Sequence, residues 1–472
     1  MVSQMPPPLL TACGDSAQLP EEAAVGSNPT LSAPNPTLIP TVNVAPAKSW
    51  PDVAKPKPAA ELEANAFATG LDHPRWLHVL PNGDVLVAET NAPPREAKGV
   101  KGMVMQFYMK RAGAAAPSAN RITLLRDTNG DGVADIKTEF LTGLNSPFGM
   151  ALVGNALYVA NTDAVMKFDY TPGATRIEGP GTKVADLPAG PLNHHWTKGL
   201  AANRDGSRLY VSVGSNSNAA ENGIEKEEQR ATILEIVTAT GESRVFASGL
   251  RNPVGIAFEP RTSVLWAVVN ERDELGSDLV PDYLTSVKDR GFYGWPYSYF
   301  GQHIDERVKP QRPDLVAQAI VPDYALGNHV APLGLVFAQA NRLPAQYQNG
   351  AFIGLHGSWN RKPLAGYKVV FVPFADGKPS GKPVDVLTGF VNDAGEAMGR
   401  PVGVAIDRRG MLLVADDVGN AVWRVAPAQR AAENRYWLGG LINFGVSAPP
   451  PRASFPRGTS RPSSASLRPA AA

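Results

Sequence analysis

One pattern recurs six times between residues 70 and 415 and restricts the fold more than any other feature of the sequence. Each copy contains a polar loop, a short apolar run, a tight turn and a second apolar run. The loops lie at residues 70–74, 143–147, 192–195, 249–253, 329–332 and 399–401. A unit that is repeated in this way folds by stacking its copies against one another.

Each copy predicts a β-hairpin, because its apolar runs are rich in Val, Ile, Leu and Tyr, and residues 229–236 predict a further strand. A lone hairpin cannot bury both of its faces, whereas a ring of stacked sheets does so and leaves only short edges. The copies begin about 50 to 80 residues apart, so long loops must join the strands. We therefore predict an all-β fold, a six-bladed β-propeller, over residues 59–430.

Both ends of the chain differ from the repeats in composition. Residues 14–58 are rich in Pro, Ala, Ser, Thr and Asn, and we expect them to form a disordered tether. Residues 431–472, with three consecutive prolines at 449–451, are expected to be a largely disordered extension. Residues 1–13 end in Leu-Thr-Ala-Cys and resemble the remainder of a bacterial lipoprotein signal with its lipobox.

The only cysteine, Cys13, lies at the end of this lipobox. A single cysteine excludes an internal disulfide, a cysteine metal cage and a Cys-x-x-Cys-His haem site. We expect Cys13 to carry a lipid, which predicts a periplasmic or cell-envelope location with the lipid as the only membrane anchor. The formal net charge is +1 and the basic residues are scattered, which argues against a nucleic-acid partner.

The repeated loops all precede an innermost strand, so their polar side chains should converge at one mouth of the central channel. Four of the seven histidines lie in these loops. The alternative for any single residue is that it caps a hairpin and bonds a neighbouring carbonyl. The converging residues are His73, Arg75, Asn145, His194, His195, Arg251, Asn252, His329 and Arg400.

Four tracts of the chain resemble, in the same order, those of the glucose/sorbosone dehydrogenase family of soluble quinoproteins. They are Asn-His-His at 193–195, Arg-Asn-Pro-Val-Gly-Ile-Ala-Phe at 251–258, Gly-Phe-Tyr-Gly-Trp-Pro at 291–296 and His-Gly-Ser-Trp-Asn-Arg at 356–361. The resemblance spans residues from about 66 to 426. It implies oxidation of a sugar or sugar aldehyde by hydride transfer to pyrroloquinoline quinone (PQQ), with electrons passing to an external cytochrome or quinone.

The resemblance also implies roles for individual residues. Hydride transfer from an alcohol needs a base for the hydroxyl proton and stabilisation of charge on the accepting oxygen. The base is expected at His195, while Arg251 and Asn252 are expected nearest the quinone oxygens, with Arg251 counted as catalytic. Arginine suits the three carboxylates of PQQ because it binds them bidentately and keeps its charge. The remaining cofactor-binding candidates are Arg361 or Lys362, Arg400, Asn145 and His329.

The sequence predicts two calcium sites. In the family, calcium is bound beside the quinone through a Gly-Pro turn that residues 270–278 lack, so Asp273, Glu274 or Asp278 could supply oxygens there. Independently, residues 127–135 match the start of an EF-hand-like loop, with Gly132 at the sixth position. Its oxygens would come from Asp127, Asn129, Asp131 and Asp135, and the alternative is a turn without an ion.

Two other functions stay open at this level. A calcium-dependent lactonase on the same architecture would need several carboxylates at the channel mouth, where the loops offer His and Arg instead. A binding propeller without catalysis would need apolar and aromatic residues across that face.

Overall fold

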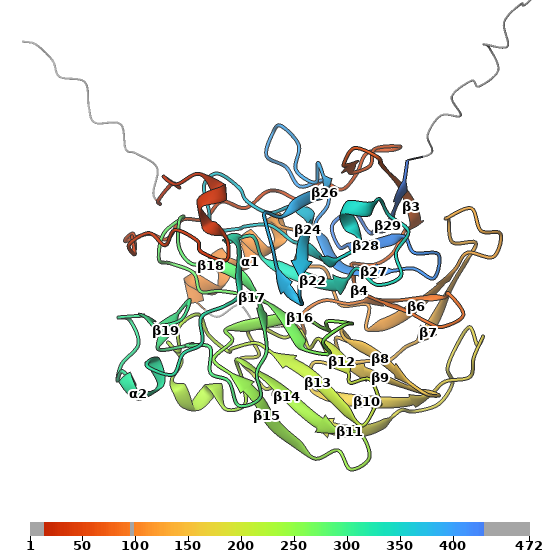
Figure 1. The fold of residues 1–472 in the computed structure, drawn as a ribbon, viewed down its shortest axis with the longest axis horizontal. Coiled ribbons are helices and arrows are strands. Elements are labelled where there is room, and N and C mark those ends of the chain that lie inside the picture. Colours follow the sequence, from red (N-terminus) through yellow and green to blue (C-terminus); the bar gives the residue numbers. More distant parts are fainter. Residues whose placement is uncertain (1–13, 95–98, 429–472) are drawn as a thin grey trace, which may run out of the picture. The chain divides into compact units, whose positions relative to one another are not determined.

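The computed structural model describes residues 14–94 and 99–428, and within them six small sheets form a six-bladed β-propeller, which confirms the predicted fold. Cys13 with its lipobox and the extension at 431–472 lie outside the described residues. The chain visits the blades in order around the ring, as the colours of Figure 1 show.

Each blade begins with the innermost strand and continues outward by antiparallel pairing. Blade 1 contains β4 (Pro74–Val79), β5 (Val85–Glu89), β6 (Arg121–Arg126) and β7 (Ile136–Leu141). Blade 2 contains β8 (Met150–Val153), β9 (Ala156–Ala160), β10 (Ala164–Asp169) and β11 (Thr182–Asp186). Blade 3 contains β12 (Leu200–Ala202), β13 (Arg208–Val213), β14 (Thr232–Val237) and β15 (Ser243–Ser248).

The next two blades have longer insertions. Blade 4 contains β16 (Asn252–Phe258), β17 (Leu265–Asn270), β18 (Pro281–Ser286) and β21 (Tyr324–Asn328), with β19 (Ser298–Tyr299), β20 (His303–Ile304) and the short helix α2 (Pro313–Val316) inserted before β21. Blade 5 contains β22 (Pro332–Phe337), β23 (Gly350–Leu355), β24 (Lys368–Ala375) and β26 (Val384–Thr388), with β25 (Lys378–Pro379) beside β24.

Blade 6 closes the ring with a strand from the other end of the domain. It contains β27 (Pro401–Ile406), β28 (Leu412–Asp416) and β29 (Ala421–Pro427), and its outer strand is β3 (Leu62–Thr69). The strands β29 and β3 pair antiparallel over their full length, with Ala421 opposite Thr69 and Pro427 opposite Leu62. This pairing joins the two ends of the propeller, so no blade keeps a long open edge.

The six innermost strands contact one another in sequence around the channel, and glycine permits the closest approaches. A Cβ atom at Gly255 of β16 would lie 2.6 Å from the Leu333 carbonyl oxygen of blade 5. Only a residue without a side chain fits there. The repeated loops therefore precede strands that are held at minimum separation, which brings their side chains together at one end of the channel.

Residues 14–58 differ from the tether expected from their composition. They follow the surface of the propeller, where β1 (Val25–Gly26) pairs with β21 and β2 (Lys57–Pro58) pairs with β26. The indole of Trp50 donates to Asp416 at 2.7 Å, and Asn43 donates to the Arg361 carbonyl at 2.8 Å. Composition predicted disorder because the segment has little periodicity, but specific polar contacts to the blades order it.

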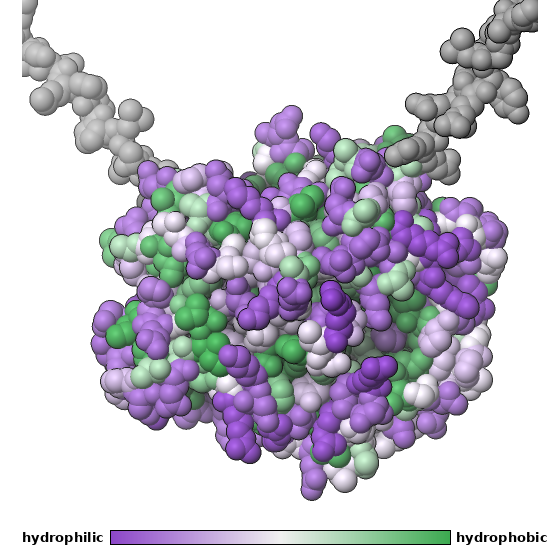
Figure 2. Space-filling model, in the orientation of Figure 1, coloured by the Kyte–Doolittle hydropathy of each residue, from purple (hydrophilic) through white to green (hydrophobic). Residues whose placement is uncertain are grey.

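The longer of the two α-helices among the described residues, α1 (Gly99–Arg111), lies in the connection between β5 and β6. Apolar side chains stand on its exposed surface, among them Phe107, which is 62% exposed. Neither helix among the described residues has the length and apolar character needed to cross a membrane. Figure 2 shows one face of the molecule, which is largely hydrophilic with apolar side chains in smaller patches.

Candidate active site

Four of the six repeated loops, at residues 192–195, 249–253, 329–332 and 399–401, line a cavity of about 400 Å³ at one mouth of the channel together with α1. Other cavities lie elsewhere on the surface, but this one collects the residues that the sequence indicated for chemistry. The predicted residues that line it are Arg75, His194, His195, Arg251, Asn252, Asp273, His329 and Arg400. Met105, Tyr108 and Met109 of α1 add an apolar side to the cavity.

His195 precedes β12 and presents one ring nitrogen to this cavity. Its Nδ1 lies 2.8 Å from the Ser215 carbonyl oxygen and 3.1 Å from the Ser215 hydroxyl. Because a carbonyl only accepts, Nδ1 carries the proton and Nε2 is left with a lone pair. Burial lowers the pKa of His195 well below 6.5, and the charge of Arg251 adds to the effect. The imidazole is therefore neutral and able to accept a proton at Nε2.

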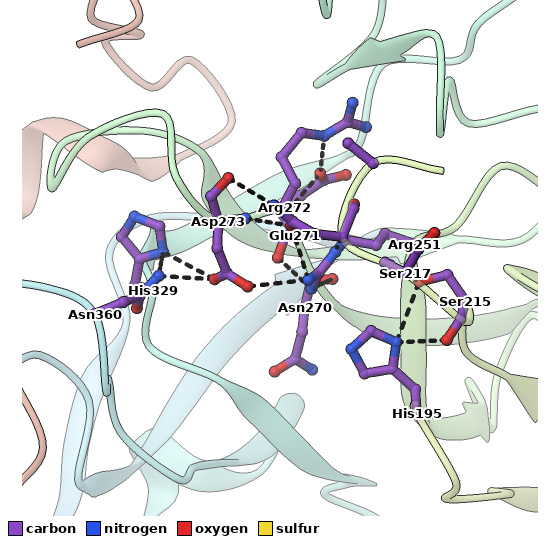
Figure 3. A network of polar contacts seen from close by, with 12 residues as sticks. His195, Ser215, Ser217, Arg251, Asn270, Glu271, Arg272, Asp273, His329 and Asn360 are labelled. Atoms are coloured by element: carbon purple, nitrogen blue, oxygen red, sulfur yellow. Dashed lines mark hydrogen bonds and ion pairs between the residues drawn. The ribbon is translucent and has the colours of Figure 1, made fainter. Parts of the chain in front are cut away.

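A polar network joins the loops of blades 3, 4 and 5 beside this histidine (Figure 3). The guanidinium of Arg251 donates to Asp273 at 3.0 Å and to the Glu271 carbonyl at 2.6 Å. The amide of Asn360 donates to the other oxygen of Asp273 at 2.7 Å. His329 Nε2 lies 2.9 Å from the Gly276 carbonyl and is part of the same network. Arg251 is thus held rigidly at the cavity wall.

The loop that carries Asp273 is anchored by Arg272, whose side chain is fully buried. Its guanidinium donates to Glu271 and to Asp305, each at 3.0 Å, and to the Ser298 carbonyl at 2.6 Å. Burial opposes ionisation of Asp305, but Arg307 and Arg272 nevertheless hold its pKa at about 2. The network fixes the loop from behind, so Asp273 projects toward Arg251 from a rigid support.

The opposite wall of the cavity is basic. Arg400 is 4% exposed and forms no ion pair with any carboxylate of the described residues. Its Nη2 donates to the Ala45 carbonyl at 3.3 Å, and its Nε is buried without a partner. Arg75 and His356 line the same wall and both contact Asp417. Isolated buried charge is costly, so Arg400 indicates a site for an anionic group.

Three predicted cofactor-binding residues do not line this cavity. Asn145 donates to Asp163 at 2.8 Å near the surface. Arg361 is buried but directed elsewhere, with its Nε on the Ser277 carbonyl at 3.0 Å and its Nη1 on the Pro363 carbonyl at 3.0 Å. Its neighbour Lys362 is not among the lining residues either. A motif places residues along the chain, but it does not decide on which side of a loop each one projects.

The residues proposed for the quinone-linked calcium are not gathered. Asp273 pairs with Arg251, Glu274 is exposed, and Asp278 accepts the backbone N–H groups of Gln18 and Leu19 at 2.5 and 3.1 Å. The carboxylate of Asp278 is thus occupied by hydrogen bonds from the N-terminal segment, which composition predicted to be a disordered tether. In residues 14–94 and 99–428, no three His, Cys, Asp or Glu side chains come together as a metal site.

The loop at 127–135 lies apart from the cavity, between β6 and β7. Asp127 accepts the N–H groups of Gly130 and Gly132 at 2.6 and 3.0 Å, and Asp135 accepts that of Thr128 at 2.6 Å. Arg409 contacts Asp127 at 3.6 Å. The loop has the turns expected from its sequence, at a distance from the predicted chemistry.

Sequence reasoning placed Arg75 at the channel mouth without a specific role, and it assigned no role to His356, to Asp417 behind the cavity wall or to α1. Arg75 directly follows a repeated loop, and His356 begins one of the motifs. Asp417 follows a strand, and its importance depends on which cations surround it in space. The helix α1 lies in a long connection whose path the sequence did not indicate.

Comparisons with known proteins show which proteins this chain is similar to. The family described as TrAA12-like matches residues 56–283 and 309–428. An uncharacterized protein of Borreliella burgdorferi is 28% identical over 60% of this chain and 76% of its own length. The PQQ-dependent pyranose dehydrogenase of Coprinopsis cinerea is 25% identical over 49% of this chain, which spans only 36% of that enzyme.

The same architecture has been solved. The holo form of the PQQ domain of the pyranose dehydrogenase from Coprinopsis cinerea superposes with a TM-score of 0.64 at 20% identity. The match covers 81% of this chain and 100% of that domain. At this identity the likeness establishes the fold.

Proposed function

The chain belongs to the TrAA12-like family, and from the cavity at its propeller mouth we propose that it oxidises a sugar or sugar aldehyde with PQQ as cofactor. The observation that carries this proposal is the pairing, in one cavity, of a neutral imidazole, His195, with a buried guanidinium, Arg400, that forms no ion pair with a carboxylate in the described part of the chain. The imidazole can accept a proton, and the arginine can bind an anionic cofactor. The name of the Coprinopsis enzyme supports the same cofactor and substrate class.

The described residues fit this cofactor. PQQ has three carboxylates, and Arg400 offers a buried Nε without a partner. Asn252 is 8% exposed and offers an unpartnered Oδ1 at the other side of the cavity. We assign Arg400, Arg251, Asn252 and His329 to hold it. When bound, the quinone supplies the acceptor for a hydride from the substrate carbon.

The protein groups then have separate tasks. His195 takes the hydroxyl proton of the substrate at Nε2, while its Nδ1 stays bonded to Ser215. The guanidinium of Arg251, fixed by Asp273, stabilises negative charge that develops beside it. Tyr108 and Met105 exclude water from the apolar side. Electrons leave to an external cytochrome or quinone in this proposal.

Calcium and the membrane anchor belong to the proposal as well. Asp273, Glu274 and Asp278 do not fit a shared calcium, and no step is derived through one. We keep calcium at the loop of residues 127–135 on the sequence spacing of its oxygens alone, since its three aspartates do not come together as a metal site in the structure. A lipid on Cys13 and a periplasmic location are proposed from the lipobox alone.

Reconstitution tests the function. The purified protein is freed of cofactor, supplied with PQQ and Ca²⁺, and assayed by dye reduction with a panel of aldoses and sugar aldehydes. PQQ-dependent turnover is expected. Replacing His195 by Ala should lower kcat/KM by about 100-fold or more, because it removes the proton acceptor.

The matched control is His303→Ala, since His303 is an exposed histidine away from the cavity. It should keep full activity. Ester or lactone hydrolysis without PQQ would instead support a lactonase, and absence of both activities would support a binding propeller. Full turnover by the His195→Ala protein would refute the assignment of the base.

A further inference from the structure

A second histidine of the cavity is held by a buried carboxylate. His356 follows β23, and its Nε2 lies 2.9 Å from Asp417 Oδ2. The same oxygen accepts from Arg75 at 2.6 Å, and His73 Nε2 lies 3.6 Å from it. The side chain of Asp417 is 2% exposed. Asp417 therefore has three basic neighbours, contributed by blade 1 and by the loop after blade 5's second strand.

The protonation pattern of His356 follows from this contact. Burial opposes ionisation of Asp417, but His356, His73 and Arg75 hold its pKa well below the usual range, so Asp417 is a carboxylate. A carboxylate only accepts, hence His356 Nε2 carries the proton. Burial lowers the pKa of His356, so the free ring is neutral. Its Nδ1 then has a lone pair and no hydrogen-bond partner in the described part of the chain.

The wall around this ring has more positive than negative charge. Asp417 is offset by Arg75, whereas Arg400 beside them has no acidic partner in residues 14–94 and 99–428. Two nitrogen atoms, Arg75 Nε and Arg400 Nε, are buried and unpartnered. Unpaired buried donors of this kind are rare unless a ligand completes them.

We propose that His356, Arg75 and Arg400 form a receptor for one carboxylate of the bound cofactor, and that His356 takes up a proton at Nδ1 when that carboxylate binds. This inference rests on the proposed function. It adds a carboxylate site on the wall opposite His195 and a linkage between cofactor binding and pH.

The physical reason is the lone pair on Nδ1. A carboxylate placed against it would be repelled, whereas an imidazolium would donate to it. The bound anion also offsets Arg75 and Arg400, which disfavour a charged ring in the free protein. Asp417 stabilises the imidazolium from the other side. His73 stays neutral, because burial lowers its pKa to about 4.

The sign of the pH dependence follows. The pKa of His356 lies below 6.5 in the free protein and is raised by the ligand, so protonation accompanies binding between these two values. In that range the affinity for PQQ should fall by about tenfold per pH unit as pH rises. A receptor made of arginines alone would show no such slope.

Calorimetry measures the proton directly. PQQ is titrated into the cofactor-free protein at several pH values from about 5 to 8, each in two buffers whose ionisation enthalpies differ. The difference in apparent enthalpy gives the number of protons taken up, which should rise toward one between the free and bound pKa values of His356. His356→Gln keeps a donor toward Asp417 but cannot titrate, so its uptake should fall by about one proton. His303→Gln, which changes the exposed histidine, is the control.

The outcomes separate the two proposals. PQQ binding with uptake that His356→Gln abolishes supports both. PQQ binding without uptake in the unaltered protein, or with the same uptake in His356→Gln, overturns the receptor and leaves the proposed function. No PQQ binding overturns both. If the variant fails to fold, the unaltered protein still decides, since no proton uptake and no pH slope of the PQQ affinity anywhere in this pH range would be incompatible with the proposal.

Discussion

Replacement of Arg272 by Met tests whether the buried ion network supports the active-site loop. Arg272 and Glu271 have no exposed side-chain surface, and Asp305 is 1% exposed. The change leaves Glu271 as a buried carboxylate without a cation, whereas Asp305 keeps Arg307 at 2.7 Å. Loss of one partner of a buried pair costs about 3 to 5 kcal/mol. We expect the lower end, because only one of the two acids is left unpaired.

The assay is urea unfolding followed by tryptophan fluorescence. Arg307→Met is the matched control: it also removes a partner of Asp305, but Arg307 is 30% exposed, so about 0 to 1 kcal/mol is expected. Adding Glu271→Gln to Arg272→Met should recover part of the loss by removing the unpaired charge. A loss below about 1 kcal/mol for Arg272→Met, or no recovery in the double variant, would refute the reasoning.

Three further predictions concern pH, packing and calcium. Because burial and Arg251 lower the pKa of His195, kcat/KM should stay constant down through pH 6.5 and fall only at more acidic pH; a fall centred at 6.5 would contradict the neutral, buried ring. Gly255→Ala should destabilise by about 1 to 3 kcal/mol in urea, since its Cβ would lie 2.6 Å from the Leu333 carbonyl, and unchanged stability would show that the channel strands can separate. Calcium should raise the Tm of the unaltered protein over that in EGTA but not that of Asp127→Asn, and equal Tm values in the unaltered protein would make the loop a turn without an ion.

Much of the fold could be predicted because the repeat is local. Each copy specifies a hairpin by its own apolar runs, and such hairpins become stable only by stacking. The closing strand β3 could not be seen in this way, since it precedes the first copy and pairs with β29 at the other end of the propeller. The order of residues 14–58 was missed for a similar reason: Trp50 and Asn43 meet partners more than 300 positions away.

The candidate site, like the fold, could be predicted only in part from the sequence. The chemical types were evident from the sequence: a histidine in a loop before an inner strand at His195, and arginines at positions 251 and 400 suited to an anionic ligand. These positions follow from the repeat, because each repeated loop must end at the channel mouth. The direction in which each side chain points was not evident from the sequence. The side chain of Arg361 points toward Ser277, and that of Asp278 points toward the N-terminal segment.

The sequence by itself determined the ring of six hairpins and the kind of side chain that the mouth of the ring would present, because both depend on short-range pattern. Only the tertiary structure decided which charges are compensated. Asp417 neutralises Arg75 and orients His356, and Asp273 neutralises Arg251, while the guanidinium of Arg400 forms no ion pair among the described residues, although its backbone N–H donates to Asp416. Electrostatic pairing depends on distances of a few ångströms between residues remote along the chain, and folding alone brings those residues together.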